Sequence, residues 1–335
     1  MSQLETKGRT SSVAPRILLV GAGAVGQVYG QALQRGGAHV SFLVRAKYKA
    51  EVAAGLLLYR ISGKRGREAE PFMPDGVYGH FDELKDERFD QVWLCVSTPA
   101  AQSGIADETC DLGRLIRNLH GATLVVLQAG PQVTNLVEAL VPARQRCDGG
   151  IAMISYQAPL VPDEVPEPGV AYWTPTPSPF EGADDEAIVA LLRAGGCPAK
   201  VAQDTRSMMS FGSATLMPTM VALEGAGWKV SGLRRGPWAR LATHASREAR
   251  NIVAKTRATE APAAMDMLGP VGLKGLSFVA PAIMPFDLDV YLRYHFSKVH
   301  DQTRLLIDHY VSEGERVGLP TAELRELRSN VFGSA

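Results

Sequence analysis

The stretch GAGAVG, residues 21–26, constrains the fold more than any other part of this sequence. It follows the apolar run RILLV and precedes QVYGQALQRGG, which has helical spacing, and then a second apolar run, AHVSFLVR. Strand, glycine turn, helix and strand in this order form the unit of a parallel sheet. In the pattern GxGxxG the glycines permit a tight turn, close approach of a pyrophosphate and tight packing of helix on strand. We therefore predict a Rossmann-type domain that binds a dinucleotide, rather than a purely structural turn, through Gly21, Ala22, Gly23, Ala24, Val25 and Gly26.

The end of the second strand bears on which dinucleotide is bound. An NAD site usually places an Asp or Glu there for the ribose 2′-hydroxyl, whereas this chain has Arg45, Lys47 and Lys49 and no acid before Glu51. A guanidinium binds phosphate bidentately, so Arg45 favours the 2′-phosphate of NADP(H); the alternative is an ordinary group of surface cations. Ligands of parallel sheets bind beyond the carboxyl ends of the strands. Further cofactor contacts are therefore expected from Ser97, Thr98 and Gln128.

Composition narrows the class of protein. The 335 residues are 46% apolar and 21% charged, which is typical of a soluble globular protein of about two domains. Thirty-five basic residues balance thirty-five acidic ones, so neither nucleic acid nor an anionic membrane is expected as the main partner. Residues 1–15 are polar, without the apolar core of a secretory signal, and are expected to be a disordered leader. Four scattered cysteines without metal-binding spacing indicate reduced thiols and a cytoplasmic protein: Cys95, Cys110, Cys147 and Cys197.

The remaining chain divides into two halves by pattern. Apolar runs at residues 89–97 and 122–130 predict further strands, and shorter β-type segments follow in GGIAMISYQ, GVAYWTPTP and AKVAQ. The proline-rich segment from Pro159 to Phe180 suits edge strands and turns. Residues 206–226, 236–258 and 287–317 have helical spacing. We therefore predict a nucleotide-binding domain over residues 16–205 and an all-α domain over residues 206–332.

The ordered set of motifs resembles the ketopantoate reductase (2-dehydropantoate 2-reductase) family. The motifs are ILLVGAGAVGQVYGQAL, FLVR, VWLCVSTPAAQ, LVVLQAGPQ, SATLMPTMVAL, GLRRGPWARL and GERVGLP, and they extend from Arg16 to about Asn330. The resemblance implies a Rossmann-type domain followed by a helical domain like the C-terminal domain of 6-phosphogluconate dehydrogenase. It also implies NADP(H), hydride transfer to a 2-keto acid in the interdomain cleft, and a homodimer formed through the helical half.

This sequence departs from the family at the substrate site. The family's catalytic lysine falls on Met209, its orienting asparagines on Ser213, Met217 and Ala129, its serine on Val290 and its glutamate on Gln302. A ketone that accepts hydride needs a proton source near its oxygen, and a carboxylate needs strong donors. One interpretation is a larger, more apolar substrate pocket, and the other is that these side chains pack the helical core: Met208, Met209, Phe211, Met217 and Met220.

The segment YLRYHFSKVHDQT, residues 291–303, offers a replacement for the missing proton donor. As one helix it would gather Tyr291, Tyr294, His295, Lys298 and Gln302 within an arc of roughly 100°. The family's serine and glutamate positions bracket this arc, so it is expected to face the cleft. Lys298 or His295 would donate the proton, with Tyr294 and Gln302 orienting the substrate, unless these are solvated or packed side chains. His244 and Glu248, one helical turn apart, are weaker candidates for the same cleft.

Two functions are compatible with these patterns. The first is an NADP-dependent oxidoreductase of the ketopantoate reductase superfamily that reduces a C=O or C=N bond of a substrate other than ketopantoate. The second is a non-catalytic NADP(H)-binding redox sensor or partner-binding module that kept the fold and lost the chemistry.

Overall fold

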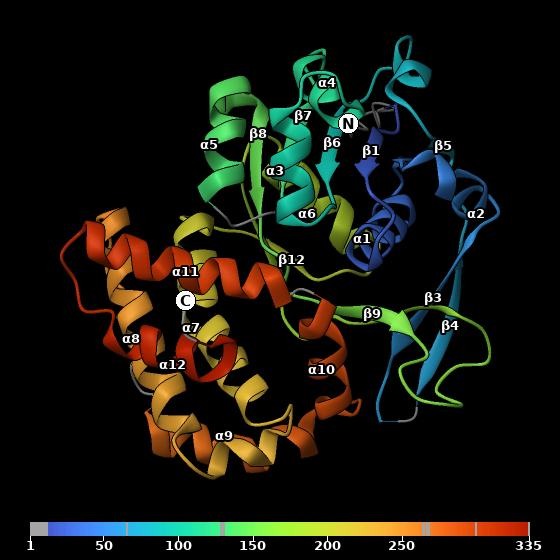
Figure 1. Cartoon of the computed structure of the whole chain (residues 1–335). Coiled ribbons are helices and arrows are strands. Elements are labelled where there is room, and N and C mark those ends of the chain that lie inside the picture. The colour runs from blue at the N-terminus through green and yellow to red at the C-terminus, as the bar shows by residue number, and fades with distance from the viewer. Residues whose placement is uncertain are drawn as a thin grey trace, which may run out of the picture.

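Figure 1 shows the computed structural model, in which a sheet-containing part stands beside a part built from helices alone. The structure describes residues 13–64, 66–127, 131–262, 265, 269–298 and 300–333, and it leaves the side chains of residues 131, 132 and 302 undescribed. This arrangement confirms the predicted fold class, a Rossmann-type α/β domain followed by an all-α domain.

The main sheet has eight strands in the order β12-β11-β8-β7-β6-β1-β2-β5. All neighbouring pairs are parallel except β11 with β8. The strands are β1 (Arg16–Val20), β2 (His39–Leu43), β5 (Gly76–Tyr78), β6 (Gln91–Leu94), β7 (Thr123–Val126), β8 (Arg146–Gly149), β11 (Ser178–Gly182) and β12 (Ala199–Val201). The predicted strands near residues 89–97, 122–130 and 199–203 are thus confirmed as β6, β7 and β12.

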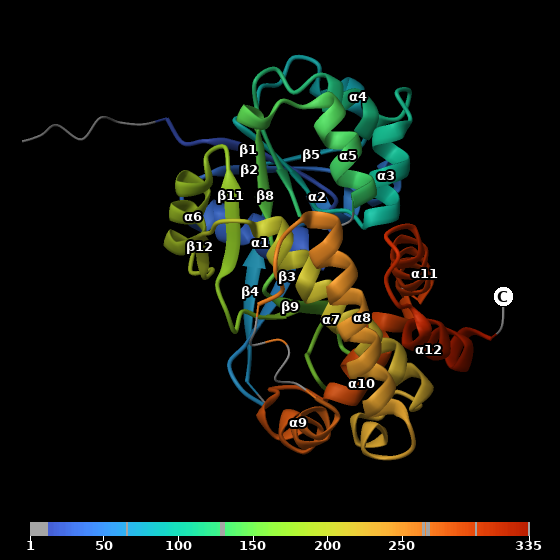
Figure 2. The ribbon, with the colours of Figure 1, turned by 90° about the vertical axis from the view of Figure 1, so that its left-hand side faces the viewer.

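Helices cover both faces of this sheet (Figure 2). One face carries α1 (Ala24–Arg35) and α6 (Asp185–Ala194), and the other carries α3 (Thr98–Ala106), α4 (Asp111–Arg117) and α5 (Pro131–Leu140). Ile17 and Leu19 pack toward α1 while Leu18 and Val20 pack toward the opposite layer, and all four are buried. Burial on both faces explains why RILLV is a continuous apolar run rather than an alternating one.

A second sheet, not anticipated from the sequence as a separate layer, has four strands in the order β4-β3-β10-β9. Its strands are β3 (Leu56–Ile61), β4 (Arg67–Phe72), β9 (Ile154–Ala158) and β10 (Gly169–Trp173). The connections between strands also contain the helix α2 (Lys49–Ala53) and the short 3-10 helices η1 (Ala46–Tyr48), η2 (Phe81–Leu84) and η3 (Ala143–Gln145). The small sheet packs against the helical half through an aromatic cluster that includes Tyr156, Phe286 and Tyr291.

The helical half follows from Thr205 onward. It contains α7 (Thr205–Gly225), η4 (Val230–Arg234), α8 (Trp238–Arg257), α9 (Pro270–Ile283), α10 (Leu288–Lys298), α11 (His300–Arg316) and α12 (Ala322–Phe332). The helices predicted at residues 206–226 and 236–258 are confirmed as α7 and α8. Among the described helices, none alone has the length and apolar composition to cross a membrane; α9 and α10 meet both criteria only as a pair bent by 106°.

Candidate functional site

The glycine turn between β1 and α1 has the geometry that its sequence predicts. Gly21 has a φ of +99°, a conformation that favours glycine, and a Cβ on Gly26 would lie 2.3 Å from the carbonyl oxygen of Gly21. A Cβ on Gly23, in contrast, would meet no described atom within 4 Å. Gly21 and Gly26 therefore close the turn, while the backbone at Gly23 stays open for a ligand to approach.

The start of α1 is suited to an anion. Gly23 is its N-cap, so no side chain satisfies the first N–H groups, and the first turn contains no acid. The amide of Gln27 donates a hydrogen bond to the carbonyl of Ala22 over 2.9 Å and fixes the turn from within. Ala22, Ala24 and Val25 pack partly against the sheet core. Free N–H groups at the positive end of a helix fit a pyrophosphate, so these residues fit the dinucleotide.

The end of β6 lies directly beside this turn. A Cβ on Gly21 would approach the side chain of Val96 to 2.8 Å and the carbonyl of Cys95 to 3.2 Å. Ser97 then caps α3 through its backbone, without a hydrogen bond from its side chain to the described helix, and Thr98 is the first residue of α3. The structure therefore brings Ser97 and Thr98 to the same edge as the glycine turn. Gln128, the other predicted contact, lies outside the described residues.

Arg45 follows β2 and caps η1 at this same edge of the sheet. Its guanidinium lies 5.1 Å from the ring centre of Tyr48 and donates a hydrogen bond of 3.4 Å to the Tyr48 hydroxyl. Lys47 also lies over this ring, at 4.8 Å, whereas Lys49 forms an ion pair of 2.5 Å with Glu83. Lys49 is thus a structural surface cation. Tyr48 was missed in the sequence, although its position three residues after Arg45 places it within reach.

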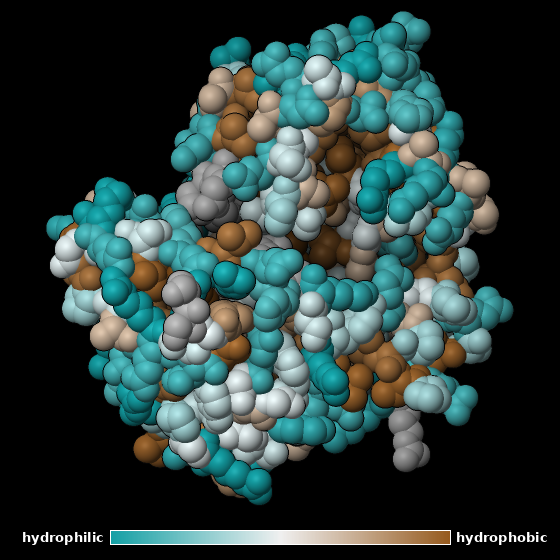
Figure 3. Space-filling view, in the orientation of Figure 1, coloured by the Kyte–Doolittle hydropathy of each residue, from teal (hydrophilic) through white to brown (hydrophobic). Residues whose placement is uncertain are grey.

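The face of the molecule in Figure 3 is hollowed between the sheet domain and the helical half, and apolar side chains line the bottom of the hollow. In the matching ribbon view, the hollow opens among α1, α3 and the junction of α10 with α11 (Figure 1). The carboxyl ends of β1 and β6 point toward it. This is the position at which ligands bind in open parallel sheets.

The predicted single helix over residues 291–303 is wrong. α10 ends at Lys298 and α11 begins at His300, and Figure 1 shows the two helices running in different directions. Gln302 therefore does not share a helical face with Tyr294, His295 and Lys298, and its side chain lies outside the described part of the chain. The predicted helix at residues 287–317 is likewise divided into these two helices. Gln302 on α11 therefore cannot be placed on the same arc as the α10 residues by counting 100° per residue.

The polar groups on α10 form a local cluster. Lys298 donates a hydrogen bond to the Tyr294 hydroxyl, and its ammonium lies 3.8 Å from the centre of the Tyr294 ring. His295 stacks on Tyr291 at 5.5 Å and meets Phe296 edge-on at 4.9 Å. Burial, and secondarily Lys298, lowers the pKa of His295, so its imidazole is neutral at pH 7. Tyr291 itself is buried against Tyr156 and Phe286, which makes it a packing residue.

The apolar residues of α7 mostly pack the helical core. Phe211 and Met220 are buried in that core, and Met217 packs against it. Met209, at the family's lysine position, lies against Gly150, where an added Cβ would meet its sulfur at 2.7 Å. Ser213, at an asparagine position, accepts a hydrogen bond of 3.4 Å from Tyr310. Packing of the core is therefore the better interpretation for Phe211, Met217 and Met220.

His244 and Glu248 both contact helix α12. His244 lies 3.4 Å from the carboxylate of Glu323, and Glu248 accepts a hydrogen bond of 2.9 Å from the backbone of Leu324. Both partners belong to the first turn of α12. The two side chains therefore connect α8 to α12. Glu248 also stabilises the N-terminal end of α12, where an acid is favourable.

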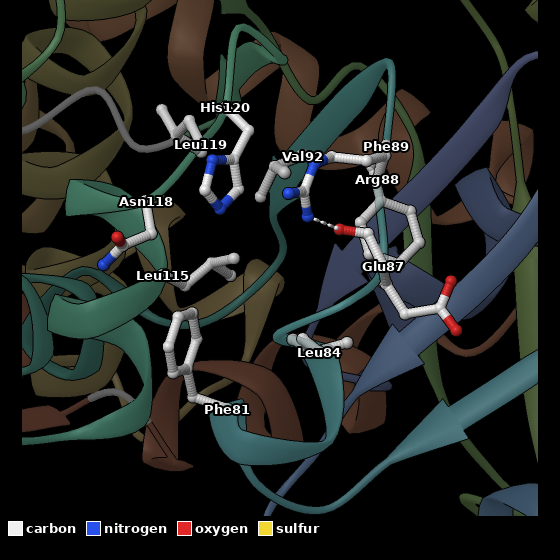
Figure 4. A pocket seen from close by; sticks show the side chains of 10 residues that line it. All are labelled: Phe81, Leu84, Glu87, Arg88, Phe89, Val92, Leu115, Asn118, Leu119 and His120. Atoms are coloured by element: carbon white, nitrogen blue, oxygen red, sulfur yellow. Dashed lines mark hydrogen bonds between the residues drawn. The ribbon is translucent and has the colours of Figure 1, made fainter.

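A small cavity of about 20 Å³ lies elsewhere in the sheet domain (Figure 4). Phe81, Leu84, Leu115 and Leu119 give it an apolar lining, and Arg88 donates a hydrogen bond to the backbone carbonyl of Glu87 at its edge. Arg88 and Phe89 precede β6, so the cavity lies at the amino end of that strand. A space of this size holds about one water molecule and is unrelated to the dinucleotide edge.

A comparison with known families agrees with this geometry. Residues 17–158 match the family model described as ketopantoate reductase PanE/ApbA. This segment, less than half of the chain, is similar to the ketopantoate reductase family. The match confirms the resemblance predicted from the motifs, over the part of the chain that holds the glycine turn and the ends of β1, β2 and β6.

Solved structures with the same fold cover both halves of the chain. D-mandelate dehydrogenase, in a ternary structure with NADH and anilino(oxo)acetate, has a TM-score of 0.70 and 12% identity, covering 95% of this chain and 97% of that one. 2-Dehydropantoate 2-reductase from Porphyromonas gingivalis W83 has a TM-score of 0.67 and 15% identity, with coverage of 94% and 98%. A PanE/ApbA family ketopantoate reductase from Ralstonia eutropha JMP134 has a TM-score of 0.66 and 18% identity, with coverage of 95% and 97%. No curated protein matches the chain significantly. At these identities the likeness establishes the fold alone.

Proposed function

We propose that this protein is an NADP(H)-dependent oxidoreductase that transfers hydride to the C=O or C=N bond of a small molecule other than ketopantoate. The observation that carries the proposal is the glycine turn, closed by Gly21 and Gly26 and open at Gly23, at the start of an uncapped helix. A bound nicotinamide supplies the hydride. The family match over residues 17–158 and the dehydrogenase fold of the structural neighbours support oxidoreductase chemistry.

The preference for NADP(H) rests on Arg45. This exposed guanidinium follows β2, where an NAD site would carry an acid, and Glu51 is the first acid after that strand. Tyr48 contacts the guanidinium through its ring and accepts one hydrogen bond from it, and the remaining donors of this exposed group would bind a 2′-phosphate. The D-mandelate dehydrogenase neighbour was solved with NADH, so the fold alone does not select the cofactor.

For the proton, we propose Lys298 in preference to His295. The ammonium of Lys298 is exposed and held by Tyr294, whereas the lowered pKa of His295 leaves its imidazole neutral. Tyr294 would orient Lys298, and Gln302 would contact the substrate from α11. The substrate would be more apolar than ketopantoate, because Met209 and Met217 replace polar groups of the family. We further propose a cytoplasmic homodimer.

A non-catalytic dinucleotide sensor is the second candidate. The observation in its favour is that Met209 packs on Gly150 instead of presenting a donor to a substrate. Such a protein would bind NADPH and leave it unoxidised in the presence of ketones, keto acids and imines.

The decisive experiment measures NADPH binding and NADPH oxidation separately. NADPH should bind saturably in a fluorescence titration, and one class in a ketone, 2-keto acid and imine panel should be reduced. Lys298→Met should then lower kcat by about 10²- to 10⁴-fold, the usual contribution of a general acid, with the NADPH dissociation constant unchanged. Lys200→Met, at an exposed strand position, is the matched control.

Each outcome distinguishes the candidates. Absence of NADPH binding contradicts both functions, and binding without turnover across the panel favours the sensor. Full activity in both Lys298→Met and His295→Ala would remove α10 from the chemistry, and rapid turnover of ketopantoate would contradict the change of substrate.

A further inference from the structure

A larger hollow lies between the small sheet and the helical half, away from the glycine turn. Its volume is about 850 Å³, within the range of roughly 300–1,000 Å³ that accommodates small organic ligands. The β3–β4 turn and the loop after β9 form one wall, and η4 with the adjoining ends of α9 and α10 forms the other. Figure 1 shows these walls facing each other where the tip of the β3–β4 hairpin approaches α9 and α10. None of its lining residues belongs to the glycine turn, to Arg45 or to the Lys298 cluster.

Much of the lining is apolar. The apolar residues come from both walls and include Leu160, Val230, Pro281, Phe286, Leu288 and Val290. Phe286 is held in place by Tyr156 and Tyr291, whose ring centres lie 6.0 and 5.1 Å away. A fixed apolar wall of this kind binds the hydrocarbon body of a ligand without losing side-chain freedom on binding.

Arg234 gives the hollow its polar anchor. The guanidinium carbon lies 3.8 Å from the ring centre of Phe278, so one face of the group is covered by an aromatic ring. The Nε atom is buried and has no hydrogen-bond partner among the described residues. A cation–π contact leaves the in-plane N–H groups of arginine free, and a buried donor without a partner is costly. The terminal Nη1 and Nη2 groups are not among these buried atoms, so they are the donors of Arg234 that an acceptor on a ligand can reach.

The other charges around the hollow are mostly engaged. Arg67 donates to Glu164 over 3.1 Å and to the carbonyl groups of Gly63 and Gly66. Glu164 also accepts hydrogen bonds from Tyr156 and from the backbone of Leu160.

Two acids at the start of α10 accept hydrogen bonds from backbone N–H groups. Asp289 accepts a hydrogen bond of 2.8 Å from Val230 and lies 3.4 Å from Lys229, and Asp287 accepts one of 3.1 Å from Val290. Exposed Lys64 and Asp163 stand at the rim and offset each other in charge. Arg234 is left as the cation directed at a ligand.

We propose that this hollow binds a small amphipathic carboxylate, with its carboxylate on Arg234 and its hydrocarbon body against Phe286, Leu288 and Val290. The site is distinct from the proposed active site and does not depend on the proposed function. Octanoate, a medium-chain fatty acid, has this combination of a carboxylate and a hydrocarbon body and serves as the probe.

Calorimetric titration of the full chain with octanoate tests the proposal. One octanoate should bind per chain, and 1-octanol, which has the same chain without the charge, should bind at least about tenfold more weakly, as expected for a lost charge-assisted hydrogen bond. Arg234→Gln should weaken octanoate binding by a similar factor. Arg235→Gln, an exposed neighbour with the same change of net charge, should leave it unchanged.

A second variant keeps the charge and removes the space. Val290→Trp should abolish octanoate binding while the far-ultraviolet circular dichroism stays native, because the indole occupies the place beside Phe286 and Leu288 where the hydrocarbon body would lie. The proposal is overturned if octanoate does not bind, if octanol binds equally well, or if Val290→Trp binds octanoate like the wild type. If Arg234→Gln fails to fold, the octanol comparison and Val290→Trp still decide the question.

Discussion

The glycine turn and helix α10 were both predicted to be functional, but they obtain their geometry in different ways. The turn is determined by contacts within a few residues: Gly26 lies against the Gly21 carbonyl, and Gln27 bonds to Ala22. The polar side chains of α10 depend on where the helix ends and on what covers it. Lys298 is the last residue of α10. Tyr291 is buried against the small sheet, whose strands come from residues 56–72 and 154–173.

The difference shows what kind of sequence pattern is dependable. A backbone motif carries its own geometry because glycine conformations and steric limits act locally. A face of polar side chains assumes a continuous helix, and that assumption fails when the helix ends at Lys298. The comparison can be sharpened by changing each region in turn.

The largest effect is expected at the glycine turn. Gly26→Val would place side-chain atoms against the Gly21 carbonyl, so we expect a destabilisation of about 1–3 kcal/mol and a loss of NADPH affinity of about 100-fold or more. Gly23→Ala meets open space instead and should keep the melting temperature while weakening NADPH binding. Thermal melts and NADPH titrations of both variants would separate the two roles. Equal melting temperatures for both variants would show that the turn is less constrained than its geometry indicates.

An intermediate effect is expected at the end of β2. Arg45→Ala should weaken NADPH binding by about tenfold or more, with little change for NADH, because the lost partner is the 2′-phosphate. Lys49→Ala is the control, since Lys49 is paired with Glu83. Dissociation constants for both dinucleotides provide the measurement. A parallel loss of NADH affinity in Arg45→Ala would mean that the guanidinium acts on a part common to both cofactors.

The smallest effect concerns His295 and pH. Burial lowers its pKa in the folded state, so the folded protein favours the neutral imidazole. The contribution of this lowered pKa to the free energy of unfolding is complete above the ordinary histidine pKa of about 6.5. It is lost as the pH falls through the lowered pKa, and the free energy of unfolding decreases by less than about 1.4 kcal/mol per pH unit. His295→Phe should therefore lose less stability than the wild type between pH 7.5 and pH 5 in urea unfolding.

The control for this pH effect is Ser297→Ala, which changes an exposed, non-titrating side chain on the same helix. Its loss of stability on acidification should match that of the wild type. If His295→Phe also follows the wild-type curve, packing on Tyr291 and Phe296 does not suppress protonation of His295.

Much of the fold and the cofactor edge could be predicted from sequence. RILLV, GAGAVG and the following helix are contiguous, and their pattern directly indicates β1, the turn and α1. Ser97 and Thr98 could be predicted because every parallel strand ends at the same edge. Two strands of the small sheet, β9 and β10, lie in the predicted segments GGIAMISYQ and GVAYWTPTP. The strands β3 and β4 and the sheet as a separate layer were missed, since β3 pairs with β10 across more than one hundred residues and no local pattern specifies that pairing. The contacts of His244 and Glu248 with α12 were likewise not predicted, because their partners lie more than seventy residues further along the chain.

The sequence by itself determined the Rossmann-type glycine turn, its cationic neighbour Arg45 and the succession of a sheet domain and helices, because these depend on short-range sterics and periodic burial. The tertiary structure decided that Lys298 pairs with Tyr294, that His295 is held in its neutral form, that α10 and α11 separate, and that Arg234 faces a hollow beside Phe278. Exposure, pKa and cavity shape depend on which distant segments pack together. That packing is a property of the whole fold and of no single stretch of sequence.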